Sequence, residues 1–278
     1  MKITKANGET APFDKAKIRH SLKRVHASKS EIKQVTDTVK DQLYEGMSTA
    51  KLYRIVFNEL KKLKKGAAGR YNLKRAIMAL GPSGFPFEQF VAAIWKFDGF
   101  SVETNVVIDG ACVSHEVDVV SDGHGLQEFI ECKHHSVRGK VCTVKIPLYF
   151  QSRFLDIEKQ KLSQLKNTGL SYKGWLVTNM RFTSEAIKYG TCAGLGLLSW
   201  DYPPKNGLRD RIDKAGLHPI TSLTSISRTR QQKLMRRSIT LCRELCERSE
   251  VLDSIGIHGS KAELVIEEAR AICGSGTS

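Results

Sequence analysis

The sequence lacks several features that would assign it to a familiar class. No C-x-x-C spacing occurs among its seven cysteines, and the one close pair, Cys242 and Cys246, has the i, i+4 spacing of a helix, so neither a disulfide framework nor a zinc site fits. No apolar run approaches the roughly 18 residues needed to span a bilayer, and no signal-peptide pattern opens the chain. We therefore expect a cytoplasmic protein with reduced thiols. Three cysteines, Cys112, Cys132 and Cys142, lie in or near expected strands and are predicted to be small core residues.

A Gly-rich Walker-type loop is also absent, which argues against nucleotide hydrolysis by a P-loop mechanism. What the chain has in excess is positive charge. The net charge is +15, and residues 1–80 alone carry 19 basic and 7 acidic side chains. Such an excess favours polyanionic partners, either nucleic acid or nucleotide phosphates, although basic helices can also serve solubility alone.

Two short linkers divide the 278 residues into expected domains. The first is Leu-Gly-Pro-Ser-Gly at 80–84 and the second is Tyr-Pro-Pro-Lys-Asn-Gly at 202–207. We expect a multidomain α/β protein with three parts. They are a β-hairpin plus helices over 1–80, a central mixed β-sheet flanked by helices over 84–204, and a helical domain over 206–273.

The central part contains a carboxylate, a short gap, and then a carboxylate and a lysine two residues apart. These residues are Asp118, Glu131 and Lys133, and both surrounding segments have the apolar, β-branched composition of short strands. Side chains alternate along a strand, so Glu131 and Lys133 project from one face, about 7 Å apart. The turn-rich residues 121–125 suit a hairpin that brings Asp118 beside Glu131. Two such carboxylates can hold Mg²⁺, and the lysine can orient an attacking water, although acid-x-Lys at a strand end is common.

A preceding helix adds a third carboxylate. Apolar residues at 87, 90, 91, 94 and 95 follow the i, i+3, i+4, i+7 pattern of a buried helix face, and Glu88 falls within it. A carboxylate on such a face needs a partner, which a metal or a site lysine would supply. The alternative is structural, because Glu88 lies in the first turn, where the helix dipole favours acids.

The order of these motifs resembles the Mrr-type restriction endonuclease domain of the PD-(D/E)xK superfamily. Phe-Glu-x-Phe-Val at 87–91, Val-Asp-Val-Val at 117–120 and Glu-x-Lys at 131–133 carry the resemblance, and Thr-x(4)-Thr-x-x-Ala at 178–186 extends it. It implies a restriction-endonuclease-like fold with Glu88, Asp118, Glu131 and Lys133 as catalytic residues. Mg²⁺ (or Mn²⁺) would be held by Asp118, Glu131 and the Cys132 carbonyl. His134 and Gln151 are further expected contacts to DNA. Gln151 lies on a helix whose Tyr149 and Arg153 are also expected to face the cleft.

The first eighty residues resemble an ATP-cone, the nucleotide-sensing module of ribonucleotide reductases. Ile-Thr-Lys-x-x-Gly at 3–8, Phe-Asp-x-x-Lys-Ile at 13–18 and Ser-Thr at 48–49 carry this resemblance, with helices expected after Asp14 and at 30–45, 49–64 and 67–80. It implies that ATP or dATP binds at Lys5, Asp14, Lys17 and Thr49. A degenerate cone kept as a DNA-binding or dimerising domain is the alternative.

The C-terminal part combines a basic helix with a motif similar to a helix-hairpin-helix. The helix carries Arg228, Arg230, Lys233, Arg236 and Arg237, and the motif spans 254–262. Such hairpins offer backbone N–H groups to a DNA phosphate, with Lys261 as a further contact. A plain helical cap or a dimer surface fits equally well.

These patterns together predict a metal-dependent DNA endonuclease that ATP or dATP regulates, acting in prokaryotic restriction or antiphage defence. Cutting both strands needs two active sites, which implies a homodimer or larger assembly. Two alternatives remain. One is a structure-specific repair or recombination nuclease, and the other is a non-catalytic, nucleotide-responsive DNA-binding regulator.

Overall fold

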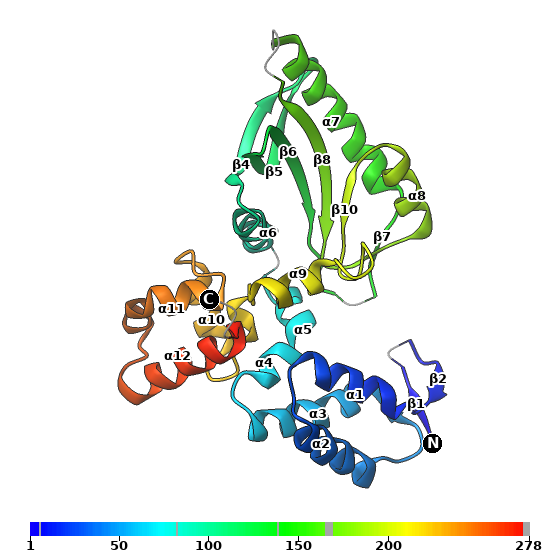
Figure 1. Cartoon of the computed structure of the whole chain (residues 1–278), viewed down its shortest axis with the longest axis vertical. Coiled ribbons are helices and arrows are strands. Elements are labelled where there is room, and N and C mark those ends of the chain that lie inside the picture. The colour runs from blue at the N-terminus through cyan, green and yellow to red at the C-terminus, as the bar shows by residue number, and fades with distance from the viewer. Residues whose placement is uncertain (6, 82, 138, 165–168, 275–278) are drawn as a thin grey trace. The chain divides into compact units, whose positions relative to one another are not determined.

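The computed structural model describes residues 1–5, 7–81, 83–137, 139–164 and 169–274 (Figure 1). The chain forms two compact units, one of residues 1–73 together with the segment from 222 onward, and the other of residues 74–221. The unit boundaries therefore fall at 73/74 and 221/222, whereas the linkers suggested breaks near 80–84 and 202–207. The N-terminal helices and the C-terminal helices share one unit.

The N-terminal part of the first unit starts with a small sheet. Strand β1 (Lys2–Thr4) pairs antiparallel with β2 (Thr10–Pro12) and parallel with β3 (Met47–Ser48). Three helices follow, α1 (Lys15–Arg24), α2 (Lys29–Gln42) and α3 (Thr49–Leu63). Each begins at a polar cap: Asp14, Ser28 and Ser48 accept hydrogen bonds from first-turn N–H groups. The expected hairpin and these three helices are confirmed, and their apolar faces form one core around Leu22, Val39 and Val56.

The prediction of a single helix over 67–80 is wrong. The chain forms two short helices, α4 (Ala67–Tyr71) and α5 (Leu73–Met78), separated by Asn72. The Asn72 side chain accepts a hydrogen bond of 2.7 Å from the Tyr53 hydroxyl, which ties the break to α3. Asparagine is a poor helix former because its side chain competes for local hydrogen bonds, so the break falls at a residue that tolerates it.

The C-terminal part of this unit is helical. Its elements are α10 (Arg228–Met235), α11 (Cys242–Glu247), the 3₁₀ helix η2 (Ser249–Ile255) and α12 (Gly259–Cys273), after the 3₁₀ turn η1 (Ile220–Ser222) at the boundary. A buried carboxylate organises them. Glu268 on α12 accepts hydrogen bonds from the Thr224 N–H, the Thr224 hydroxyl and the Ser225 N–H at 2.6–2.9 Å, which satisfies its buried oxygens.

The second unit is built on a five-stranded mixed sheet in the order β10-β8-β6-β5-β4 (Figure 1). Its strands are β4 (Ser101–Asp109), β5 (Ser114–Gly123), β6 (Leu126–Lys133), β8 (Ser171–Thr178) and β10 (Gly196–Leu198). The pairs β4–β5 and β5–β6 are antiparallel, and β6–β8 and β8–β10 are parallel. Strands β7 (Val141–Cys142) and β9 (Arg181–Phe182) form a separate parallel pair. The helices are α6 (Phe85–Phe97), α7 (Lys145–Gln164), α8 (Ser184–Cys192) and α9 (Leu208–Ala215).

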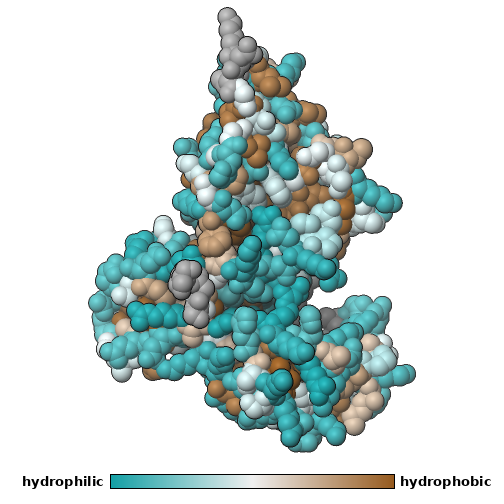
Figure 2. Space-filling model, viewed as in Figure 1, coloured by the Kyte–Doolittle hydropathy of each residue, from teal (hydrophilic) through white to brown (hydrophobic). Residues whose placement is uncertain are grey.

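Helices α7 and α8 pack on the sheet through an aromatic and aliphatic core that includes Phe129, Phe150, Phe154 and Leu176. Elsewhere in this unit, the Trp95 and Trp175 indoles each donate a 2.6 Å hydrogen bond to the buried Glu128. Figure 2 shows scattered hydrophobic side chains on the visible surface of the sheet unit among many hydrophilic ones. No helix in the described part of the chain is both long and apolar enough to cross a membrane.

The cysteine predictions are confirmed for two of three positions. Cys132 and Cys142 are buried, whereas Cys112 is exposed. Cys112 lies in the connection between β4 and β5, so the prediction that it is a core residue is wrong. The reason is that β4 ends at Asp109 and β5 begins at Ser114, so the residues between them form a turn on the surface.

Candidate active site

A tight hairpin brings Asp118 and Glu131 together, as the sequence predicts. His124 and Gly125 form the turn with φ of 54° and 73°, the left-handed geometry of a two-residue hairpin. The β5–β6 register ends with Val119 opposite Ile130, the residues directly next to Asp118 and Glu131. The Asp118 Oδ2 accepts a 2.6 Å hydrogen bond from the Cys132 main-chain N–H. The hairpin therefore fixes one carboxylate directly against the Glu-x-Lys segment.

Glu131 is held by two cations. It is 4% exposed, and its two carboxylate oxygens form ion pairs with Lys133 and with Arg153, the latter at 2.7 Å. Arg153 comes from α7 and also donates to the Glu116 carbonyl. A buried carboxylate requires such pairing, and α7 supplies one of the two cations that pair with Glu131 at the end of β6.

The third carboxylate, Glu88, joins this group from the first turn of α6. Burial and the charges of Asp118, Glu116 and Glu131 raise the pKa of Glu88 to about 7, and a hydrogen bond from Asn105 opposes part of this rise. Burial and the Glu131 charge likewise raise the pKa of Asp118 to about 6, against the Cys132 hydrogen bond and the nearby cations. The carboxylates therefore repel one another, and a bound cation would relieve that repulsion.

Lys133 stays a cation. Burial by itself would lower its pKa, but the hydrogen bond and charge of Glu131 and the charge of Asp118 outweigh burial, so the pKa of Lys133 is raised. Its backbone is fixed as well, because the Thr178 hydroxyl donates a 2.7 Å hydrogen bond to the Lys133 carbonyl. A protonated lysine at this position can orient water or stabilise negative charge, but it cannot accept a proton.

The donor chemistry of this group fits a hard cation. Carboxylate and carbonyl oxygens are the ligands that Mg²⁺ prefers, and Asp118, Glu131 and the Cys132 carbonyl offer them on adjoining strands. Among the described residues, however, no three His, Cys, Asp or Glu side chains are already grouped as a metal site. Both oxygens of the Glu131 carboxylate form ion pairs, one with Lys133 and one with Arg153.

His134 and Gln151, the two other residues of this domain that were predicted to contact DNA, have different surroundings. The His134 ring packs on Phe87 at 5.2 Å and bonds the Ile77 carbonyl at 3.0 Å, and burial lowers its pKa. Strand alternation explains this, since His134 points to the face opposite Lys133. On α7, the Gln151 Oε1 is buried without a hydrogen-bond partner among the described residues, while its neighbour Tyr149 is 62% exposed.

Sequence reasoning missed Asn105, which lies on β4 with a φ of 55° between the pairs Thr104–Val119 and Val106–Val117 and whose amide opposes the rise in the pKa of Glu88. Its strand, β4, was not recognised, because residues 101–109 mix charged, polar and apolar side chains at the edge of the sheet. The available signal was the residue type, since asparagine tolerates left-handed backbone better than other side-chain-bearing residues.

In the N-terminal part, the predicted nucleotide residues lie at opposite ends of the small sheet, because Pro12, which leads into Asp14 and Lys17, pairs with Lys2 rather than with Thr4. Thr4 pairs with Ser48, so Lys5 and Thr49 follow on neighbouring strand ends. Asp14 caps α1 through a 2.8 Å bond from the Ala16 N–H, and Lys17 lies exposed one turn later. Lys5 forms a 3.0 Å ion pair with Glu9. The lysines therefore stand near the first turns of two helices, where an anionic ligand is favoured.

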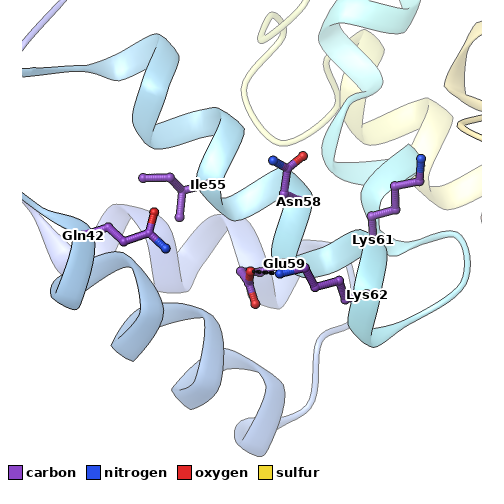
Figure 3. Close-up of a pocket in the computed structure, with 6 residues that line it drawn as sticks. All are labelled: Gln42, Ile55, Asn58, Glu59, Lys61 and Lys62. Atoms are coloured by element: carbon purple, nitrogen blue, oxygen red, sulfur yellow. Dashed lines mark hydrogen bonds and ion pairs between the residues drawn. The ribbon is translucent and has the colours of Figure 1, made fainter.

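A separate hollow lies between α2 and α3 of the same unit (Figure 3). Its volume is about 530 Å³, and its lining residues are Gln42, Ile55, Asn58, Glu59, Lys61 and Lys62. Figure 3 shows Lys62 turned onto Glu59, an ion pair of 2.7 Å that neutralises one charge of each sign. None of the four predicted nucleotide residues lines this hollow, which is a different place on the unit.

The C-terminal basic residues border the predicted hairpin. Arg230 on α10 and Arg237 in the turn after it donate to the carbonyls of Gly256 and Ser254, at 3.1 and 3.3 Å. Helix α12 starts at Gly259 with no side-chain cap, and Lys261 is exposed in its first turn. Basic side chains therefore lie next to the segment that leads into α12.

Comparison with known proteins identifies relatives for most of the chain. An uncharacterized protein from Archaeoglobus fulgidus is 37% identical over 186 residues, which is 66% of this chain and all of that protein. The chain belongs to the AF1548-like family. Residues 218–273 match the C-terminal domain described as AF1548-like, and residues 1–78 match the ATP-cone domain, which confirms the expected cone.

Solved structures include one member of the AF1548-like family. The crystal structure of AF1548, a protein of unknown function, is 34% identical, with a TM-score of 0.56 over 69% of this chain and 98% of that chain. The structure of Can2 from Sulfobacillus thermosulfidooxidans in complex with cyclic tetra-adenylate is 17% identical, with a TM-score of 0.34 over 75% of this chain and 64% of that chain. The second likeness is too low to carry an argument about fold or function.

Proposed function

We propose that this AF1548-like protein is a metal-dependent DNA endonuclease with a restriction-endonuclease-like sheet domain. The observation that carries the proposal is the convergence of Glu88, Asp118, Glu131 and Lys133 from one helix and two adjacent strands. A structural ion pair would need one acid and one base. Three mutually repelling carboxylates beside a lysine instead suit a site that gains its stability when a divalent cation and a phosphodiester bind.

In this proposal Asp118, Glu131 and the Cys132 carbonyl hold Mg²⁺ or Mn²⁺. A metal bound there would supply polarisation of the phosphoryl oxygen and a lowered pKa of bound water. Lys133, held protonated by Glu131, orients the attacking water and stabilises the negative charge of the transition state. Arg153 keeps the Glu131 carboxylate in place, and Glu88 supports the cation through water. DNA is the substrate, and a cleaved strand would carry a 5′-phosphate.

The other parts of the chain would regulate cleavage and bind DNA. The cone domain supports nucleotide binding, and we propose ATP or dATP as the ligand that tunes cleavage. The basic α10 and the start of α12 would bind DNA phosphates without reading sequence. A homodimer or larger assembly in the cytoplasm, with a role in restriction or antiphage defence, completes the proposal.

The experiment that tests it uses end-labelled DNA with wild type and Lys133→Ala in the presence of Mg²⁺ or Mn²⁺. A linear duplex and a four-way junction are compared. Cleavage of the duplex by wild type alone supports the proposal, and preference for the junction indicates a repair or recombination nuclease. DNA binding without products from either protein would favour a non-catalytic regulator.

A further inference from the structure

Helix α7, which runs along one face of the five-stranded sheet, carries a row of exposed leucines (Figure 1). Leu148, Leu155 and Leu162 are 44%, 50% and 59% exposed, and each is seven residues from the next. Seven residues are close to two helical turns, so these side chains lie along one stripe, opposite the buried Phe150 and Phe154. Single exposed leucines are common on protein surfaces, but a row at this spacing is typical of a helix–helix contact.

The rest of this stripe is also exposed. Ser152 and Lys159 occupy the positions between the leucines, and we call these five residues the leucine face. Val113, which is 60% exposed, adds apolar surface beside the middle of the helix, since its main-chain N–H donates to the Asp156 carboxylate at 3.3 Å. The apolar surface therefore extends from α7 onto the β4–β5 turn.

We propose that the leucine face is the interface between two copies of this chain, with α7 antiparallel to α7 of the second copy about a two-fold axis at Leu155. Around such an axis, positions equally far from Leu155 on either side meet. Leu148 and Leu162 are each seven residues from Leu155, so Leu148 of one copy meets Leu162 of the other, and Leu155 meets itself. The leucine face is therefore complementary to its own copy.

The charges on α7 select the antiparallel direction. In a parallel pair each residue would meet its own copy, so Lys159 would face Lys159 and Glu158 would face Glu158, which like-charge repulsion disfavours. In the antiparallel pair Lys159 instead lies at the level of Gln151, and Glu158 lies at the level of Ser152. Each charge then meets an uncharged polar side chain that can form a hydrogen bond with it.

The charge of the sheet domain also permits this contact. Residues 81–205 carry 13 basic and 13 acidic side chains, so two copies of this domain meet without net repulsion. Residues 1–80, with 19 basic and 7 acidic side chains, would repel their own copy. The sheet domain is therefore the part of the chain whose overall charge suits self-association.

The contact is small and specifies the assembly named in the proposed function. Two 20-residue helices, each about 30 Å long, bury less than the roughly 1,200 Å² of a stable interface, so we expect a dissociation constant in the micromolar range. Arg153, the partner of Glu131, lies two residues before Leu155, so the axis would place both candidate active sites at the same level along the helix pair. Only the effect on cleavage rests on the proposed function, since self-association is measured without DNA.

The test measures the mass of the full chain in solution by sedimentation equilibrium, at about 5 to 200 μM protein. Leu155→Glu places two like charges on the axis, and the matched control is Leu264→Glu, a leucine on α12 that is 53% exposed. Circular dichroism checks that both variants fold. In a second measurement Leu155→Cys is oxidised, because two copies of a residue on the axis can form a disulfide. Leu264→Cys and wild type, oxidised in the same way, give the background.

Wild type and Leu264→Glu should approach twice the mass of one chain at the highest concentrations. Leu155→Glu should raise the dissociation constant at least about tenfold, and Leu155→Cys should give more covalent dimer than either control. A wild type that stays monomeric throughout, or a dimer that Leu155→Glu leaves intact, would overturn the proposal. If the dimer depends on Leu155 but wild type cuts no DNA, the interface stands and the nuclease function is what fails.

Discussion

The Asp118 carboxylate accepts a 2.6 Å hydrogen bond from the main-chain N–H of Cys132. This bond joins the two strands of the hairpin next to Asp118 on β5 and Glu131 on β6. It uses a single oxygen of Asp118, so the other remains available to a ligand. The same bond stabilises the ionised form of Asp118, yet burial and Glu131 still raise its pKa to about 6. Burial and the negative charge of Glu131 thus disfavour the ionised form of Asp118, and a bound cation would offset both effects.

The first prediction concerns Arg153. Replacing Arg153 with Met should lower the free energy of unfolding by about 2 kcal/mol, because the buried Glu131 loses one of its two cationic partners. Lys159→Met, an exposed position on the same helix, is the control. Urea unfolding followed by tryptophan fluorescence measures the change, since all three tryptophans lie in the sheet unit. Equal stability of the two variants would contradict the pairing.

A second prediction concerns pH. Glu88 and Asp118 have pKa values raised to about 7 and about 6 in the folded chain, so the folded state binds more protons than the unfolded state at mildly acidic pH. The stability that these groups contribute is present at low pH and is lost as pH rises through their folded pKa values. In Glu88→Gln, the free energy of unfolding should therefore decline less than in wild type as the pH rises from about 4.5 to 7. The control is Glu103→Gln, an exposed carboxylate on β4, which should leave the decline as in wild type.

The third prediction links metal binding to protons. Glu88 and Asp118 are partly protonated near pH 6.5, so Mg²⁺ binding should release protons, and more at pH 6 than at pH 8. Calorimetry in two buffers of different ionisation enthalpy measures the number released. Asp118→Asn should lose the binding heat. Binding with no proton release at pH 6 would place the metal elsewhere.

The fourth prediction concerns the cone. Lys17→Ala should weaken ATP or dATP binding about tenfold, the effect expected when a charge-assisted hydrogen bond to phosphate is removed. Lys23→Ala lies on the same helix but on a different face and serves as the control. Calorimetry gives both affinities. Identical affinities for the two variants would place the nucleotide away from Lys17.

Much of this arrangement could be predicted from the sequence because it depends on local signals. The start of α1 after Asp14, the hairpin turn near residues 124–125 and the apolar face of α6 each follow from a few neighbouring residues. The proximity of Asp118 to Glu131 follows in turn from the hairpin alone.

Features that depend on distant segments were not predictable. The edge strand β4 has no clear alternation of its own and is defined by pairing with β5. The pairing of Arg153 with Glu131 depends on how α7 crosses the sheet. His134 was expected near DNA because it adjoins Lys133, but strand alternation turns it toward Ile77 and Phe87.

The central claim is tested most directly by Mg²⁺-dependent cutting of supercoiled plasmid. Wild type, Asp118→Ala and the control Asp122→Ala, an exposed aspartate on the same strand, are compared with and without ATP or dATP. We expect wild type and Asp122→Ala to nick or linearise the plasmid at similar rates that change with nucleotide, and Asp118→Ala to be slower by at least about 100-fold. Cutting by Asp118→Ala at the wild-type rate would contradict the assigned site and with it the account of the carboxylates.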